Sequence, residues 1–387
     1  MRICLVASAR FPVAEPFQGG LEAHTATLAH ALADRGHRVS VFAAPGSDPS
    51  LDVEELDVPP FEPSAAARAD VGAHPDAWMR EHHAYLALML RLARGGQSRF
   101  DVVHNNSLHH LPVAMAPMLS VPMVTTLHTP PLGWLESAIA MSGGASTFAA
   151  VSRHTAAAWS HAVQADVVPN GVDTSRWQPG PGGGRAVWTG RLVPEKAPHL
   201  AILAARRAGL AIDLAGPVLD ADYVRREVEP LLGDDARLVG HLHTDALCDL
   251  VGRAGVALVT PQWDEPYGLV AAEAMACGTP VAAFARGALA EVVGVCRPGG
   301  WRDPTTSTTS PAPPARRWCS TVPPSVTTRC GTAPCSGWSP ATRSSTPAPR
   351  ARPSPPRPHD RLLRAPPRAR ARHAGDDAPA PTSWATR

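Results

Sequence analysis

MRICLVASARFPVAEPFQGGLEAHTATLAHALADRGHRVSVFAA, residues 1–44, is the stretch of sequence that decides the fold. It contains two aliphatic runs, ICLVAS and RVSVFAA, separated by a segment in which Leu21, Leu28 and Leu32 recur at helical spacing. Gly36 follows as a signal for the end of the helix. Short aliphatic strands joined by helices are typical of a parallel sheet covered on both faces. The stretch therefore predicts a strand, loop, helix, strand unit of an α/β protein.

The same alternation continues along the chain in two series. Further strand candidates in the first series are DVVHNNS, PMVTTLHT and FAAVSR, and those in the second are AVWTG, AIDLAG, ARLVG, VALVT and PVAAFA. Between the series, VVPNGVDTSRW around Asn170 has the composition of a turn, and PGPGGG follows shortly after it. We therefore predict two Rossmann-like parallel-sheet domains, residues 1–170 and residues 171–296.

The composition of the chain changes after Cys296. Residues 297–387 hold 15 of the 36 basic residues, 4 of the 34 acidic residues and 19 of the 42 prolines, so their net charge is +11, whereas the preceding part carries −9. Large aliphatic side chains are rare in this tail, and it cannot bury a core. We predict that the tail is disordered. Because the main body is acidic, we expect no nucleic-acid partner.

The tail also suggests a shifted reading frame. With G/C-ending codons, the bases of DPTTSTTSP, residues 303–311, read in another frame as Pro-Asp-Asp-Val-Asp-Asp-Val-Ala, an acidic sequence that suits the start of a helix. We hypothesise that the frame changes near Cys296, which would leave the second domain incomplete. Retranslation of the gene in the other two frames tests this hypothesis.

Cysteine spacing and hydrophobicity indicate the compartment. The seven cysteines show no CxxC pair, which fits reduced thiols in the cytoplasm. The N-terminus lacks the apolar region of a signal peptide, and no apolar stretch is long enough to span a membrane. The amphipathic segment at residues 77–96 leaves peripheral contact with the inner membrane face open. Core packing of its Met79, Leu86, Met89 and Leu90 is the favoured interpretation.

One lysine marks a candidate anion site. Lys196 is the only lysine among the 36 basic residues, and it lies five residues after Arg191 in TGRLVPEK, between a predicted strand and a predicted helix. Free backbone N–H groups and the positive end of the helix dipole favour anions at such junctions. A guanidinium beside an ammonium suits a diphosphate. Two solvated surface cations are the alternative.

Two glutamates form the second candidate feature. Glu265 and Glu273 lie eight residues apart in EPYGLVAAE, where Pro266 and Gly268 suit the entry of a helix. Glu265 is expected in the loop before this helix and Glu273 on its second turn. Glu273 stands among alanines, a poor environment for an unpartnered charge, and this favours a ligand contact over an incidental acid.

EPYGLVAAE resembles the E-x7-E motif of the retaining glycosyltransferases of family 4, which have the two-domain GT-B fold. Further segments resemble the same family in order: QGGLEAH at residues 18–24, TLHTPP at residues 126–131, VVPNGVD at residues 167–173, TGRLVPEK at residues 189–196 and ARGALAEVV at residues 285–293. Together they span about residues 1–295.

The resemblance implies transfer of a sugar from a nucleotide-diphosphate sugar, with a UDP- or GDP-sugar donor, to an acceptor hydroxyl with retention of configuration. Arg191 and Lys196 would bind the pyrophosphate and Glu273 the ribose. The remaining implied contacts are with the transferred sugar, at Glu265, Gly268, the Gly287 loop and His128, and with the phosphate and acceptor, at Gly19 and Gly20. No cofactor and no metal are expected. The acceptor is left open among a glycan, a lipid and a small molecule.

Other interpretations were weighed against this one. The first strand is not followed by G-x-G-x-x-G, which disfavours a nicotinamide enzyme. Asp220 and Asp222 imitate a metal-binding DxD motif but suit the start of a helix better. His104, His109 and His110 are expected to cap a helix or line the wall of the site. The alternative function is a catalytically impaired nucleotide-sugar-binding protein made from a frameshifted gene.

Overall fold

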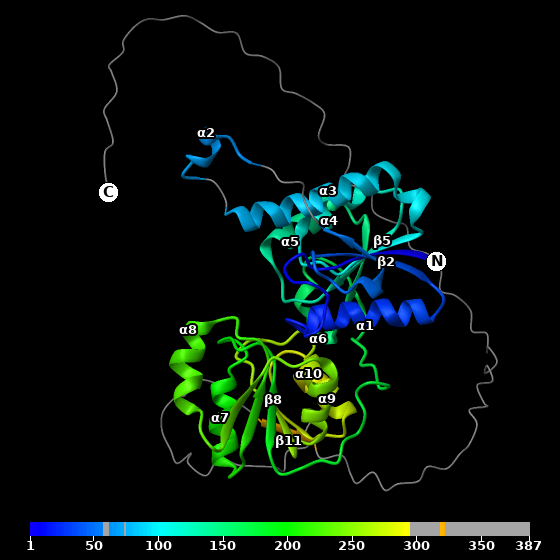
Figure 1. Ribbon diagram of the computed structural model, residues 1–387. Coiled ribbons are helices and arrows are strands. Elements are labelled where there is room, and N and C mark those ends of the chain that lie inside the picture. Colours follow the sequence, from blue (N-terminus) through cyan, green and yellow to red (C-terminus); the bar gives the residue numbers. More distant parts are fainter. Residues whose placement is uncertain (57–61, 73–74, 295–317, 322–387) are drawn as a thin grey trace, which may run out of the picture. The chain divides into compact units, whose positions relative to one another are not determined.

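The structure is a computed structural model that describes residues 1–56, 62–72, 75–294 and 318–321 (Figure 1). The described residues all fall within one compact unit, residues 1–327. The predictions of a disordered tail and of a shifted frame fall outside the described residues, with one exception. Trp318–Thr321 form a short strand, which was not expected.

The first sheet has seven parallel strands in the order β3-β2-β1-β4-β5-β6-β7. Its strands are β1 (Arg2–Val6), β2 (Arg38–Ala43), β3 (Val53–Glu55), β4 (Val102–Asn105), β5 (Met123–Leu127), β6 (Ser146–Ala150) and β7 (Asp166–Val167). The chain builds outward from β1 to β3 and then returns to the other side of β1. Ile3 therefore pairs with Val39 on one side and Val102 on the other. Ligands of such sheets bind at the carboxyl ends of the strands where the order reverses.

Helices cover both faces of this sheet. They are α1 (Gly20–Asp34), α2 (Ala65–Arg68), α3 (Asp76–Arg99), α4 (His110–Met115), α5 (Gly133–Ser142) and α6 (Arg153–Trp159), with 3-10 turns η1 (Pro49–Leu51) and η2 (Ala116–Met118). Successive β1 side chains alternate between the faces: Leu5 packs with α1, whereas Cys4 and Val6 pack with α3. Figure 1 shows α1 on one side of the sheet and α3 with α4 on the other. Both faces of β1 are therefore buried.

The buried face of α3 differs from the predicted one. Met89 is buried as expected, but Met79, Leu86 and Leu90 are only partly buried. The core positions are Ala84, Tyr85, Leu88, Met89, Leu92 and Gly96. The apolar stripe of α3 is wide enough to allow either rotation of the helix about its axis. The hydrogen bonds of the Tyr85 hydroxyl with Ala7 O and Ala9 N fix the rotation that is observed. Among the described helices, none is long and apolar enough to cross a membrane.

The second sheet has the order β10-β9-β8-β11-β12-β13. Its strands are β8 (Ala186–Thr189), β9 (Ile212–Ala215), β10 (Ala236–Gly240), β11 (Val256–Val259), β12 (Val281–Phe284) and β13 (Trp318–Thr321). All pairings are parallel except that of β13 with β12. The backbone groups of an edge strand such as β12 are open to pairing, which gives β13 its place. The strand order reverses between β8 and β11, so these strands position a second set of loops.

The helical elements of this half are α7 (Pro198–Arg207), α8 (Ala221–Tyr223), the π-helical η3 (Val224–Val228), the 3-10 turn η4 (Glu229–Leu231), α9 (Thr244–Gly252), α10 (Leu269–Ala276) and α11 (Leu289–Val292). Trp188 of β8 packs with α7, whereas Val187 packs with α9 and α10 on the opposite face. The predicted α/β class with two parallel sheets is confirmed. The boundary near Asn170 stays a prediction.

Candidate functional site

A pocket of about 990 Å³ collects residues from the carboxyl ends of both sheets. Eight of the nine predicted site residues line it: Gly19, Gly20, His128, Arg191, Lys196, Glu265, Gly268 and Glu273. Gly19, Gly20 and His128 follow strands of the first sheet, and the other five follow strands of the second. The strand reversals of the two sheets thus place loops that are distant in sequence around one space.

Lys196 and Glu265 form an ion pair in the pocket wall. The Lys196 Nζ atom donates a hydrogen bond to Glu265 Oε1, and Trp263 Nε1 donates to the same oxygen at 2.9 Å. The Lys196 ammonium also lies 5.0 Å from the centre of the Trp263 ring. The Glu265 side chain is only 8% exposed, so its charge depends on these partners. The two residues were predicted to have separate roles, and the structure joins them.

The backbone around Lys196 is held in an uncommon conformation. Ala197 follows it with a φ of 49°, in the left-handed region that costs a non-glycine residue roughly 1 kcal/mol. The buried Thr260 hydroxyl compensates, because it donates to Ala197 O at 2.9 Å and lies 3.3 Å from Lys196 O. Thr260 follows β11 and Lys196 follows β8, so neighbouring strands fix the direction of the ammonium. This strain, stored beside the pocket, is typical of functional sites.

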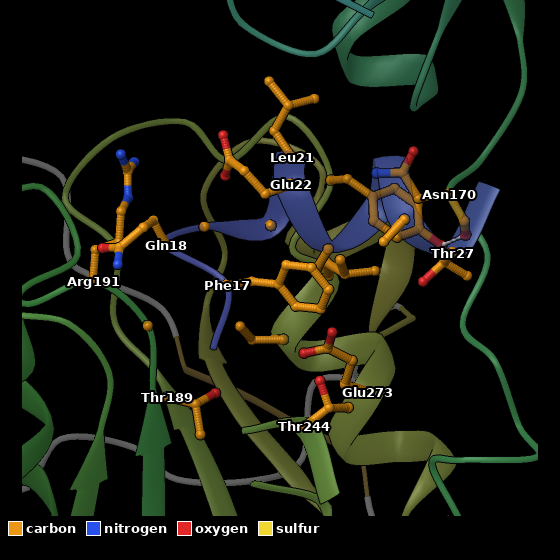
Figure 2. Close-up of a pocket in the computed structure, with 18 of the residues that line it drawn as sticks. Phe17, Gln18, Leu21, Glu22, Thr27, Asn170, Thr189, Arg191, Thr244 and Glu273 are labelled. Atoms are coloured by element: carbon orange, nitrogen blue, oxygen red, sulfur yellow. Dashed lines mark hydrogen bonds between the residues drawn. The ribbon is translucent and has the colours of Figure 1, made fainter. Parts of the chain in front are cut away.

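Arg191 lies between its own loop and the first sheet's glycine loop. Its guanidinium is 4.0 Å from Glu195, and its Cδ would lie 3.8 Å from a side-chain Cβ at Gly19. A Cβ at Gly20 would contact Leu269 of α10 at 3.7 Å. Short residues at these positions therefore let the start of α1 approach the second half closely. Figure 2 shows Arg191 beside Gln18, at the edge of the pocket.

Glu273 points from α10 into the pocket, where Figure 2 places its carboxyl group below the Phe17 ring. It lies on the second turn of the helix, as predicted, and Gly268 is the N-cap. Among the described residues its carboxyl has no hydrogen bond and no ion pair. Burial among apolar groups raises the pKa of Glu273 to about 7. A carboxyl group held this way gains hydrogen bonds when a ligand hydroxyl reaches it.

His128 follows β5, and its ring forms a hydrogen bond with the uncharged side chain of Asn106. Its Nε2 atom lies 2.7 Å from Asn106 Oδ1, and its ring centre is 5.2 Å from that of His24. Burial, with smaller contributions from His24 and His104, holds the pKa of His128 well below 6.5. The ring is therefore neutral near pH 7, and because Asn106 Oδ1 accepts, the Nε2 atom carries the proton.

Gly287 does not line the pocket but supports a residue that does. It adopts a φ of 58°, and a Cβ added at this position would clash with the backbone N and O atoms of Glu265. The neighbouring Ala288 N donates to Glu265 O at 2.7 Å. Gly287 thus shapes the loop that carries Glu265, and its predicted contact with a sugar stays a prediction.

Replacing Gly287 with alanine is expected to lower the free energy of unfolding by about 1–3 kcal/mol, because the new methyl group strains a left-handed backbone and collides with the Glu265 backbone. Urea unfolding measures the change. Gly133→Ala is the matched control, since a Cβ at Gly133 meets no atom within 4 Å. Equal stability of the two variants would contradict this account of the Gly287 loop.

The remaining sequence predictions have simple structural outcomes. Asp220 is the N-cap of α8 and accepts a hydrogen bond from Tyr223 N at 2.8 Å, as expected of a helix start. His109 caps α4 by accepting from Leu111 N at 3.2 Å. His104 Nε2 lies 2.8 Å from Thr126 Oγ1 in the first sheet. None of these contacts requires a ligand.

Sequence reasoning missed Phe17, Glu22, Thr260 and Trp263. Phe17 and Trp263 line the pocket, and Glu22 lies buried beside Gly19 and near Arg191. Burial raises the pKa of Glu22, partly offset by Arg191 and Arg10. Trp263 carried a signal that could have been used, since it stands two residues before Glu265 in a loop.

Two family models match consecutive parts of the chain. The Glycosyltransferase Family 4 model matches residues 18–176, and the Glycosyl transferases group 1 model matches residues 179–307. Glycogen synthase of Mycobacterium tuberculosis is 32% identical over 337 residues, covering 76% of this chain and 80% of the relative. A D-inositol 3-phosphate glycosyltransferase of Frankia alni is 29% identical, covering 71% of this chain and 80% of the relative.

Solved structures share the fold. A crystal structure of Anabaena HepE in complex with UDP and glucose has a TM-score of 0.57 at 19% identity and covers 76% of this chain and 83% of its own. The glycosyltransferase AviGT4 of avilamycin A biosynthesis has a TM-score of 0.52 at 22% identity, covering 75% of this chain and 81% of its own. The two Rossmann-like sheets and the pocket thus define a glycosyltransferase of the GT-B class. Within that class, the chain belongs to glycosyltransferase family 4.

Proposed function

We propose that the protein transfers a sugar from a nucleotide-diphosphate sugar to an acceptor hydroxyl with retention of anomeric configuration. The observation that carries this proposal is the convergence of Arg191, Lys196 and Glu273 on one pocket. The two cations follow β8, just before α7, where the positive end of the helix dipole adds to their attraction for a diphosphate. Glu273 supplies a carboxyl group that has no partner among the residues that the structure describes, and this suits a ribose diol.

The Lys196–Glu265 pair is compatible with donor binding. An ammonium group has three donors, so Lys196 can keep its bond to Glu265 and still contact a diphosphate oxygen. Glu265 keeps one oxygen that is not used by Lys196 and Trp263 in the described contacts. That oxygen is placed to accept from a sugar hydroxyl. The pair would then join the diphosphate and the sugar ends of the donor.

The proposed chemistry takes place on one face of the sugar. The bond between the anomeric carbon and the leaving phosphate oxygen breaks, and the acceptor oxygen bonds to the same carbon from the same face. The acceptor proton passes to the departing diphosphate. Arg191 and Lys196 stabilise the charge that develops there, which is the main catalytic contribution expected of preorganised donors. Because its ring is neutral and its Nε2–H donates to Asn106, His128 would contact the sugar by accepting a hydrogen bond at Nδ1 rather than act as an acid.

The comparisons support a nucleotide-sugar donor. The Anabaena neighbour was crystallised with UDP and glucose, and also with UDP-glucose. The relatives named glycogen synthase and D-inositol 3-phosphate glycosyltransferase have different acceptors by name, so the choice among glycan, lipid and small molecule stays open. We further propose that no metal serves the donor, because cations of the chain face it. A cytoplasmic location, with or without contact at the inner membrane face, completes the proposal.

Thermal unfolding with UDP-, GDP- and ADP-sugars tests donor binding, since a ligand specific for the folded state raises the unfolding temperature. We expect one nucleotide class to give a clear shift. NMR of the first-formed product then tests retention, because the anomeric configuration of donor and product must match. A folded protein that responds to none of these donors, or a product of inverted configuration, would overturn the proposal.

The tail composition favours a second candidate, a catalytically impaired nucleotide-sugar-binding protein. The +11 charge and 19 prolines of residues 297–387 differ sharply from the acidic main body. If the frame is shifted, the chain would keep the donor residues and lose helices of its second domain. A frame-corrected chain should then turn over faster while binding the same nucleotide. Equal turnover by the two chains would remove this alternative.

A further inference from the structure

Three histidines converge on the first half, outside the pocket. His82 lies on α3, while His109 and His110 lie at the start of α4. Each can offer a ring nitrogen within 4.8 Å of those of the other two, and each residue is half-buried. None of the three lines the pocket, and the function proposed above uses none of them.

The ligand set suits a transition metal. Imidazole nitrogens bind zinc, copper, nickel and iron, and three of them are a common protein contribution to a four-coordinate site. Zn–N bonds of about 2.0–2.1 Å would bring the three nitrogens to roughly 3.4 Å from one another. The ring nitrogens now lie up to 4.8 Å apart, so they would have to move closer by a little more than 1 Å. Rotation of the histidine side chains on α3 and at the start of α4 can supply this movement.

Neutral imidazole is the form that binds a metal, and the three rings are only partly exposed. Aromatic rings enclose the cluster: Trp78 stacks on His82 with centres 5.0 Å apart, and Trp134 lies 4.8 Å from His110.

We propose that His82, His109 and His110 form a binding site for one divalent transition-metal ion, zinc being the expected occupant, which ties α3 to the start of α4. Imidazole is the only ligand type in the cluster, which favours zinc, nickel or copper over magnesium and calcium. A fourth coordination position remains for water or an anion. The ion would connect two elements that cover the same face of the first sheet.

His109 sets the affinity of the site. Its Nδ1 atom accepts the α4 cap bond from Leu111 N, so its ring proton sits on Nε2 in the metal-free protein. Coordination of a metal through Nε2 would move the ring proton to Nδ1, which could then no longer accept from Leu111 N. Coordination through Nδ1 would replace the bond from Leu111 N directly. The metal therefore competes with the cap for this ring. A variant that keeps the cap without the imidazole separates the two roles, and asparagine, a preferred N-cap residue, does so.

The experiment is a metal titration of the full chain without a polyhistidine tag, after treatment with EDTA. Calorimetry with ZnCl₂ should show one equivalent bound, and CoCl₂ should give the visible absorption of a four-coordinate site. NiCl₂ should quench tryptophan fluorescence in part, since Trp78 and Trp134 contact the cluster. Saturation at one equivalent should also raise the unfolding temperature.

Three variants decide the assignment. His82→Ala, His109→Asn and His110→Ala should each weaken zinc binding at least tenfold, with unchanged circular dichroism. His154→Ala is the control, because His154 is exposed and remote from the cluster in sequence, and it should bind as the parent does. Absence of a one-equivalent event in the parent chain, or equal zinc affinity in all four variants, would overturn the proposal. Nucleotide binding should be unaffected throughout, so failure here leaves the proposed function untouched.

Discussion

Replacing Lys196 with methionine is expected to lower kcat/KM for sugar transfer by on the order of 1,000-fold. The change removes the ammonium proposed to stabilise the leaving diphosphate. It also leaves the Glu265 carboxylate, only 8% exposed, with Trp263 as its remaining partner among the described residues. An uncompensated negative charge next to the diphosphate then adds repulsion to the lost attraction. Initial rates at varied donor concentration, with the acceptor saturating, measure the effect.

Two further variants separate catalysis from folding. The double variant Lys196→Met with Glu265→Gln removes both charges of the buried pair and should recover stability without recovering turnover. Arg225→Met breaks an exposed ion pair with Asp222, neither of which lines the pocket, and should keep full activity. If Lys196→Met retained more than a tenth of the parent kcat/KM while folded, Lys196 would not be the diphosphate ligand.

Replacing Glu273 with glutamine should make the protein more stable and a poorer nucleotide binder. The proposed ribose contact uses the carboxylate, so its loss should weaken nucleotide affinity roughly 10- to 100-fold. The amide, in contrast, avoids the burial of a charge. Thermal unfolding and calorimetric binding at pH 8 report the two opposite changes in one variant.

The stability difference should depend on pH in a defined direction. The pKa of Glu273 rises from its ordinary 4.5 to about 7 on folding, so the folded state holds the proton more tightly. This contribution is fully present below pH 4.5 and is lost as the pH rises through 7. The parent should therefore lose about 3 kcal/mol relative to Glu273→Gln between pH 4.5 and pH 8.

Urea unfolding across this pH range measures the difference between the two proteins, which cancels groups common to both. Glu229→Gln, at an exposed position, is the matched control and should track the parent at every pH. A constant gap between the parent and Glu273→Gln would mean that Glu273 keeps its charge in the folded protein. The nucleotide affinity of the parent should rise from pH 6 to pH 8, whereas that of the variant should stay flat.

Most of the fold could be predicted because its strands follow from local hydrophobic patterns in the sequence. The ten predicted strands all appear, since runs such as ICLVAS and VALVT must be buried on both faces. The short strands β3 and β7 were missed because two or three residues show no period. β3 and β7 depend on pairing with β2 and β6 rather than on their own composition.

The candidate site was predictable as a set of residues but not as a set of contacts. Eight of nine predicted residues line one pocket because motifs follow strand ends, and strand ends meet. The Lys196–Glu265 pair joins positions 69 residues apart, and no local signal reports such a contact. The place of Gly287 in the structure differs from its predicted place for the same reason. Its motif placed it near the sugar, while the lack of room for a side chain beside the Glu265 backbone depends on the folded loop.

The division of the pocket between two sheets has an evolutionary consequence. Arg191, Lys196, Glu265 and Glu273 all come from the second sheet, whereas Gly19, Gly20 and His128 come from the first. If these residues have the proposed roles, selection for a new nucleotide can act on the second gene segment while the first stays constant. A chimera that joins residues 1–170 to the second half of a relative should inherit the relative's nucleotide preference and keep its own acceptor. Recombination at a single crossover point would be enough to create a new glycosidic linkage.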